Sequence, residues 1–180
     1  AASATTIIAN MLTDIEYDGT DYVILDQLPV TIPAQKIAQV VNTTTGAVAT
    51  GTTQIPIDDT IPQNTEGDQY MSLAITPTNA SSTLKIDVVV CANVSSGIVN
   101  AALFRDSTAE ALAVAGCTYA NGSAQGIIAY TCLVSAASVS ATTFKVRCGP
   151  DQALTMTFNG HSGVRRFGGV YASSITITEI

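Results

Sequence analysis

The chain has 180 residues, a formal net charge of −7, 47% hydrophobic residues and only 12% charged residues. Its apolar content is too high for an intrinsically disordered chain, and no apolar run approaches the roughly 20 residues of a membrane-spanning helix. Seven lysines and arginines argue against binding a nucleic-acid backbone, where clustered cations supply the affinity. The first residues, AASATTIIANML, lack a cationic start followed by an apolar block, so no signal peptide is visible in this sequence.

The first 45 residues are acidic and interrupted by prolines. Residues 1–80 hold nine acidic residues, one basic residue and five of the six prolines. Proline lacks a backbone donor, which favours extended or edge segments over central strands. The piece AQKIAQVV (34–41) is compatible with two helical turns. We predict that residues 1–45 form an extended N-terminal arm for attachment and oligomerisation, ordered mainly by contact with another chain.

Four acidic residues of this arm are spaced like ligands of a calcium loop: Asp14, Glu16, Asp18 and Asp21. The arm lacks the glycine placement and the terminal bidentate glutamate of an EF-hand. We predict no metal-binding residues, and a weak calcium site in the acidic arm stays open as the alternative.

After a small, polar boundary near residues 43–53, the dominant sequence period is two, which is typical of strands. In SITITEI, Ile175, Ile177 and Glu179 would share one face of a strand. We predict that residues 46–180 form an antiparallel, jelly-roll-like β-sandwich, an all-β fold preceded by the arm. The predicted strands are LAIT (73–76), LKIDVVV (84–90), IIAYTCLV (127–134), TTFKVRC (142–148), ALTMTF (153–158) and SITITEI (174–180).

Residues 101–116, AALFRDSTAEALAVAG, are rich in alanine, which favours a helix. Phe104 after Ile98 instead indicates a strand that leads into a turn at 105–107, and we favour strand, turn, strand. The whole chain has 14 serines and 25 threonines but few charged residues. Because open strand edges without charges invite aggregation, we expect the edges to be paired with neighbouring subunits.

Paired carboxylates are the first candidates for chemistry. Asp58 and Asp59 lie in IPIDDTIPQNTEGD, with Glu66 and Asp68 nearby. Adjacent residues of an extended chain point to opposite faces, so Asp58 and Asp59 would not converge on one bond or ion. A solvated turn is the favoured interpretation.

The second candidate is the glycine-rich segment NGHSGVRRFGG. His161 and Ser162 are neighbours in sequence, which rarely gives the geometry of a catalytic triad. Arg165 and Arg166, beside Phe167, either grip a carboxylate across a subunit interface or are solvated, and the first is slightly favoured. We predict no catalytic or cofactor-binding residues and no enzyme activity.

The four cysteines are Cys91, Cys117, Cys132 and Cys148, with no C-x-x-C pair and a single histidine elsewhere. This spacing makes a structural zinc site improbable. The cysteines form two disulfides at most, or serve as small buried hydrophobic residues. Three of them lie in apolar stretches, which favours free, buried thiols.

The strings IPIDDTIPQNTEGD and SSITITEI, within residues 38–180, resemble a β-rich module of virion proteins from tailed bacteriophages. The resemblance implies a trimeric, jelly-roll-like head on the particle, after a variable segment that attaches to the virion. We therefore expect a non-enzymatic homotrimer in the virion, assembled in the host cytoplasm: a capsid-decorating protein, short fibre or spike. Its partners would be itself and, through the arm, other virion proteins, with no nucleic acid or membrane. The alternative is a receptor- or carbohydrate-binding fibre tip that contacts glycan through Tyr119, Asn121 or His161.

Overall fold

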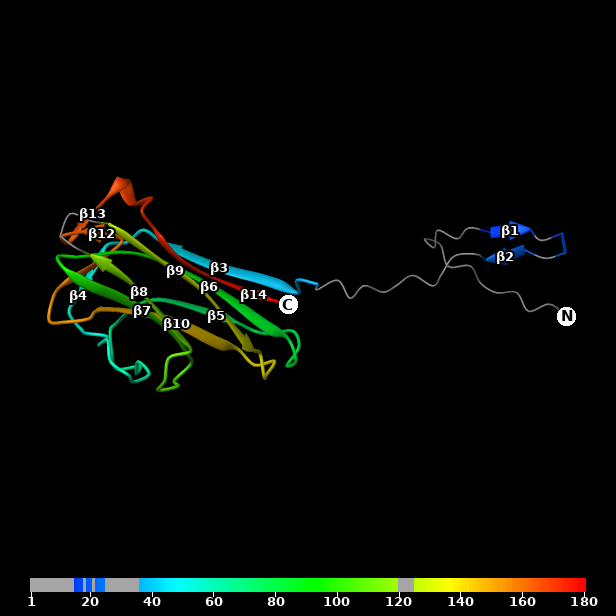
Figure 1. Cartoon of the computed structure of the whole chain (residues 1–180), viewed down its shortest axis with the longest axis horizontal. Helices are drawn as coiled ribbons and strands as arrows, with labels where there is room; N and C mark the ends of the chain where they lie inside the picture. Colours follow the sequence, from blue (N-terminus) through cyan, green and yellow to red (C-terminus); the bar gives the residue numbers. More distant parts are fainter. Residues whose placement is uncertain (1–14, 18, 21, 25–35, 120–124) are drawn as a thin grey trace. The chain divides into compact units, whose positions relative to one another are not determined.

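The computed structural model describes residues 15–17, 19–20, 22–24, 36–119 and 125–180 (Figure 1). The chain divides into two units, Ala1–Lys36 and Ile37–Ile180. The first unit contains the antiparallel pair β1 (Ile15–Tyr17) and β2 (Tyr22–Ile24). Within the described residues, no helix is long and apolar enough to cross a membrane.

The second unit is a sandwich of two antiparallel sheets, drawn face to face in Figure 1. The first sheet has the order β5 (Asp68–Ile75), β10 (Thr142–Pro150), β7 (Gly97–Arg105) and β8 (Ala113–Tyr119). The second has the order β3 (Gln39–Thr45), β14 (Ser173–Glu179), β6 (Thr83–Val94) and β9 (Gly126–Ser135).

These eight long strands, counted along the chain, lie in the orders 2-7-4-5 and 1-8-3-6, which is the strand order of a jelly roll. The predicted all-β, jelly-roll-like sandwich is therefore confirmed. The shorter elements extend its ends: β4 (Ala49–Gly51) and β11 (Met156–Phe158) lengthen the second sheet, and β12 (Gly160–His161), β13 (Val164–Arg165) and the 3₁₀ turn Phe167–Gly169 form a projecting loop.

The core lies between the sheets and is built by the alternation that the sequence predicts. In β14, Ile175 and Ile177 are fully buried, and Glu179 faces the same way. The intervening Ser174, Thr176 and Thr178 lie on the outer face and are half-buried. A sheet with one buried face requires this alternation, and β-branched threonine suits the solvated side.

The strand β3 corrects two expectations about residues 34–45. Residues 39–45 form a strand of the sandwich. The segment AQKIAQVV (34–41), which is compatible with helical turns, therefore ends in a strand. Val41 lies opposite Ile177 in the β3–β14 ladder and packs against the core. The sandwich therefore begins at Ile37 instead of residue 46. Local sequence suggested an arm because the partner of β3 lies more than 130 residues away.

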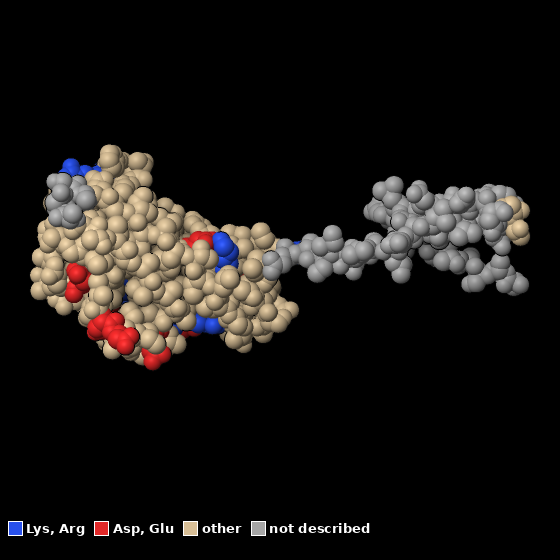
Figure 2. Space-filling model, viewed as in Figure 1, with Lys and Arg blue, Asp and Glu red and all other residues tan. Residues whose placement is uncertain are grey.

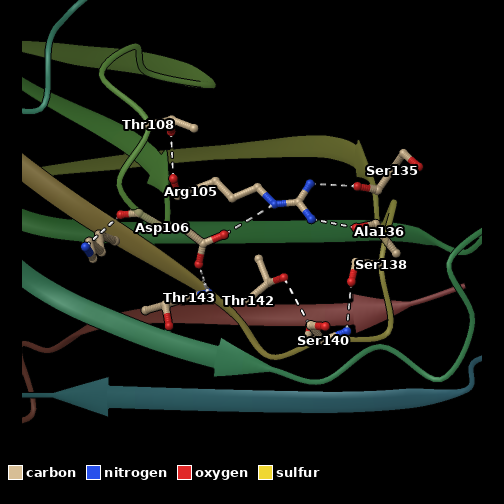
Figure 3. Close-up of polar contacts among 10 residues, drawn as sticks. Arg105, Asp106, Thr108, Ser135, Ala136, Ser138, Ser140, Thr142 and Thr143 are labelled. Carbon is tan, nitrogen blue, oxygen red and sulfur yellow. Dashed lines mark hydrogen bonds and ion pairs between the residues drawn. The ribbon is translucent and has the colours of Figure 1, made fainter.

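Residues 101–116 form strand, turn, strand as predicted, since β7 ends at Arg105 and β8 begins at Ala113. Arg105 reaches from the first sheet to the end of β9 in the second, as Figure 3 shows. Its Nη1 and Nη2 donate to the carbonyl oxygens of Ser135 (3.0 Å) and Ala136 (2.5 Å). The guanidinium also lies 5.9 Å from the centre of the Phe144 ring. This arginine therefore holds the two sheets together at one end of the sandwich.

We predict that Ile177→Ala lowers the free energy of unfolding by between about 2 and 5 kcal/mol, because it leaves a cavity at a fully buried position. The neighbouring Thr178→Ala, on the outer face of β14, should change it by less than about 0.5 kcal/mol. Urea unfolding of both variants measures the difference. Equal losses would show that β14 does not bury alternate residues.

Candidate functional site

Three carboxylates of the segment 52–68 accept hydrogen bonds from residues of the same loop. Asp58 accepts hydrogen bonds from the backbone and hydroxyl of Thr60, which lower its pKa. Asp68 Oδ1 accepts from Thr53 Oγ1 at 2.7 Å, and Glu66 Oε2 accepts from the Gln63 backbone at 3.0 Å. The exposed Asp58 agrees with the predicted solvated turn, and these bonds do not bring the carboxylates to one point.

This loop covers the outer face of the first sheet. Ile55 is buried against Ala102 and Phe104 of β7, in a small second core outside the sandwich. The Asn100 side chain donates to the Ile55 carbonyl oxygen at 2.9 Å. Sequence reasoning missed this role, because alternate residues of β7 are buried on both of its faces and the period of two is lost there.

A cleft of about 310 Å³ lies between this loop and the strands β7 and β8. Its walls contain both apolar and polar groups, and Asp58 is its single titratable residue among the described lining. One carboxylate held in a turn offers no acid–base pair for catalysis. The apolar walls include Pro56, Ile57, Pro62, Ile98 and Val114.

The strands β12 and β13 form a tight hairpin whose turn is made by Ser162 and Gly163. Both have positive φ angles, 49° and 76°. His161 Nδ1 lies 3.1 Å from an Arg166 side-chain nitrogen. Ser162 thus serves as a turn residue, and the histidine beside it contacts an arginine.

Most cations of the sandwich bind groups within the same chain. Lys85 pairs with Asp87, and Arg147 donates to the carbonyl oxygens of Glu66 and Gly67. In the described part of the chain, no carboxylate lies within 4.0 Å of the exposed Arg165 or Arg166. Figure 2 shows that charged residues are few on the face it presents and are separated by wide uncharged areas.

The residues considered for glycan contact do not form one surface. Tyr119 is 2% exposed, and its hydroxyl donates to the Ala92 carbonyl oxygen at 2.9 Å. Asn121 lies outside the described residues, and His161 is half-buried. Tyr119 is therefore a core residue.

Metal ligands are not assembled in the part of the chain that the structure describes. Its histidine, cysteines, aspartates and glutamates form no group of three that could hold an ion. Of the acidic residues of the arm, Asp14, Asp18 and Asp21 lie outside the described residues, so the open calcium alternative is untested there.

The most strongly perturbed carboxylate is Glu179, which is completely buried at the end of β14. It accepts bonds from Gln39 Nε2 (2.7 Å), from the backbone and hydroxyl of Thr78 and from the Asn79 backbone. Burial alone would raise the pKa of this carboxyl, but hydrogen bonds from Gln39, Thr78 and Ser82 lower it to about 2. Glu179 therefore joins β14 to β3 and to the loop that follows β5. The period of two in the sequence predicts that Glu179 lies on the inner face. It does not predict the hydrogen-bond partners, which lie about 100 residues or more away in sequence.

All four cysteines are free. Cys148 is fully buried and Cys91 nearly so, while Cys117 and Cys132 are half-buried. Burial raises the pKa of Cys91, Cys132 and Cys148, which makes their thiols poor nucleophiles. The cysteines pack as small apolar residues.

No known family model and no curated protein matches the chain. Solved structures match it at low identity. Eiger TNF from S. frugiperda is 8% identical with a TM-score of 0.41, covering 78% of this chain and 92% of that one. The infectious bursal disease virus Gx strain is 16% identical with a TM-score of 0.37, and the VP2 subviral particle of that virus is 11% identical with a TM-score of 0.34. These two matches cover 91% and 92% of this chain but only 43% and 41% of the viral chains, and no functional statement rests on them.

We predict that Glu179→Gln weakens the acid dependence of stability. The folded pKa of about 2 lies below the usual 4.5, so Glu179 stabilises the fold above pH 4.5, and this contribution is lost as the pH falls towards 2. Unfolding by urea across this range should show a smaller loss for the variant than for the wild type. Glu179→Asp, which keeps the charge but shortens its reach, should also be less stable near neutral pH. An unchanged pH profile in Glu179→Gln would contradict the assigned role.

We predict that four thiols react with a thiol reagent when the chain is denatured without reductant, because all four cysteines are free. In the folded protein, Cys148 should stay unreacted since its side chain is fully buried. Mass spectrometry after alkylation identifies which residues react. Fewer than four reactive thiols after denaturation would indicate a disulfide.

Proposed function

We propose that the chain is a non-enzymatic structural protein of a virus particle. The proposal is supported by the charged side chains, because most of those described form hydrogen bonds within the chain. The carboxylates of the segment 52–68 close their own turns, Arg105 and Arg147 bind carbonyl oxygens, and Glu179 anchors a strand end. Side chains that could act on a substrate are thereby used to hold the fold.

The observation that carries the proposal is the apolar surface of the sandwich. Twelve large hydrophobic side chains of the described residues are between 38% and 84% exposed. Single exposed apolar residues are ordinary, but here only 12% of the residues are charged to separate them. Such a surface suits a protein that is covered by neighbouring subunits. The twelve are Ile37, Val40, Ile57, Ile61, Leu112, Val114, Ile127, Leu133, Val139, Val164, Phe167 and Val170.

The finer proposal is a homotrimer on a tailed bacteriophage, either a capsid-decorating protein, a short fibre or a spike. It rests on the sequence resemblance of residues 38–180. In this proposal the N-terminal segment attaches the trimer to other virion proteins, and assembly takes place in the host cytoplasm. The acidic, proline-broken composition of that segment supports an attachment role.

The alternative, a carbohydrate-binding fibre tip, has weaker support. Glycan binding usually needs exposed aromatic faces for stacking. Phe167 is the one aromatic residue among the twelve exposed hydrophobic side chains, and Tyr119 is buried.

We predict that antibodies raised against residues 37–180 label intact virus particles from the source of this sequence. Electron microscopy with gold-labelled antibodies gives the position, on the head or on the tail. Competition with the purified protein should abolish the label. Particles that carry neither label nor the protein in their mass spectrum would contradict the proposal.

A further inference from the structure

One continuous stretch of the chain contains no charged residue and no histidine. It runs from Ala111 to Phe144, 34 residues, in a chain where 21 of 180 residues are acidic or basic. At that frequency, one charged residue in about nine, roughly four would be expected in 34 positions. The stretch includes the strands β8 and β9, which we call the uncharged edge.

The two strands of the uncharged edge end their sheets on the same side of the sandwich. Among the described strands, β8 pairs with β7 and β9 pairs with β6, and neither has a partner on its other side. Each therefore presents backbone donors and acceptors along an open edge. Natural sheets usually protect such edges with charged residues, prolines or bulges. The sequences of β8 and β9 contain no charge and no proline.

Three large apolar side chains of the uncharged edge face outwards, beside the exposed polar residues Thr118, Thr131 and Ser135. Ile127 and Leu133 project from β9 and are 61% and 62% exposed, and Val114 of β8 is 47% exposed. On the outer face of the second sheet, the charges nearest to β9 belong to Lys85 and Asp87 of β6, which pair with each other. Asp87 also accepts a hydrogen bond from Thr131 of β9 at 2.6 Å, and Asp58 lines the cleft that contains Val114. The strands β8 and β9 themselves carry no charge.

Interfaces in a three-fold ring join different surfaces of neighbouring copies, but residues at the axis itself face their own copies. A charge at the axis therefore meets the same charge and is repelled. A surface without charges is complementary to its own copy, whereas one that binds a different protein gains from charges opposite those of its partner. Accepting the homotrimer of the proposed function, we propose that the uncharged edge faces the three-fold axis and packs against the same edge of the neighbouring copies.

The test compares two substitutions on one row of side chains across the outer face of the second sheet. The row runs Val40, Thr178, Lys85, Leu133. Leu133→Glu places a negative charge on the uncharged edge, beside Lys85, so the fold should tolerate it. Val40→Glu is the matched control, since Val40 is 53% exposed at the opposite end of the row.

Light scattering after size exclusion and sedimentation equilibrium measure the mass and association of the full-length chain. The wild type and Val40→Glu should be trimers, three times 18.5 kDa. Leu133→Glu should associate at least about 100-fold more weakly, because three like charges meet at the axis. Mixing Leu133→Glu with Leu133→Lys should restore association by pairing opposite charges. If circular dichroism shows that Leu133→Glu is unfolded, Ile127→Glu takes its place.

The outcomes separate this inference from the proposed function. A trimeric Leu133→Glu with wild-type affinity overturns the interface and leaves the virion role intact. Equal weakening by both substitutions overturns it as well, since the uncharged edge would then have no special part in assembly. A monomeric wild type overturns the interface together with the homotrimer, while the labelling of particles decides the virion role by itself.

Discussion

The sandwich depends on its last strand, because β14 lies between β3 and β6 and hydrogen-bonds with both. Its alternation of isoleucine and threonine fills the core on one face and leaves hydroxyls on the other. Glu179 is its last inward-facing residue. The Glu179 carboxylate accepts hydrogen bonds from Gln39 of β3 and from Thr78 of the loop after β5. The strand thus joins segments that are distant in the chain, and the second sheet would lose its continuity without it.

Much of this architecture follows from the sequence because buried and exposed residues alternate in most of the strands. SITITEI shows the rule at its clearest, and the turn at 105–107 was recognisable from Arg105-Asp106-Ser107 between two strand-like segments. The bounds of the sandwich were not predictable in the same way. β3 looks like a continuation of the acidic segment until its partner, more than 130 residues later, is known. Its membership of the sheet is set by tertiary pairing, which overrides local pattern.

The side chains that could take part in catalysis or binding also divide into those placed by local sequence and those placed by distant partners. The predicted solvated turn agrees with the structure, where the exposed Asp58 accepts hydrogen bonds from Thr60. The burial of Tyr119 was less predictable, because a tyrosine at the end of a strand suits either a core or a binding loop. The contacts of Glu179 required knowledge of which loop meets the chain's end. In each case the missing information was the identity of a distant neighbour.

The central position of the C-terminal strand has a consequence for how the protein is made. During synthesis β3 and β6 emerge from the ribosome long before β14, so their sheet cannot be completed until β14 has been made. Pairing over such a distance is also slow, because a long loop must close first. The nascent chain therefore exposes the apolar residues of β8 and β9 before its core is closed. β14 is the last of the described strands to be made, so the second sheet can close only after the other strands of the sandwich have been synthesised.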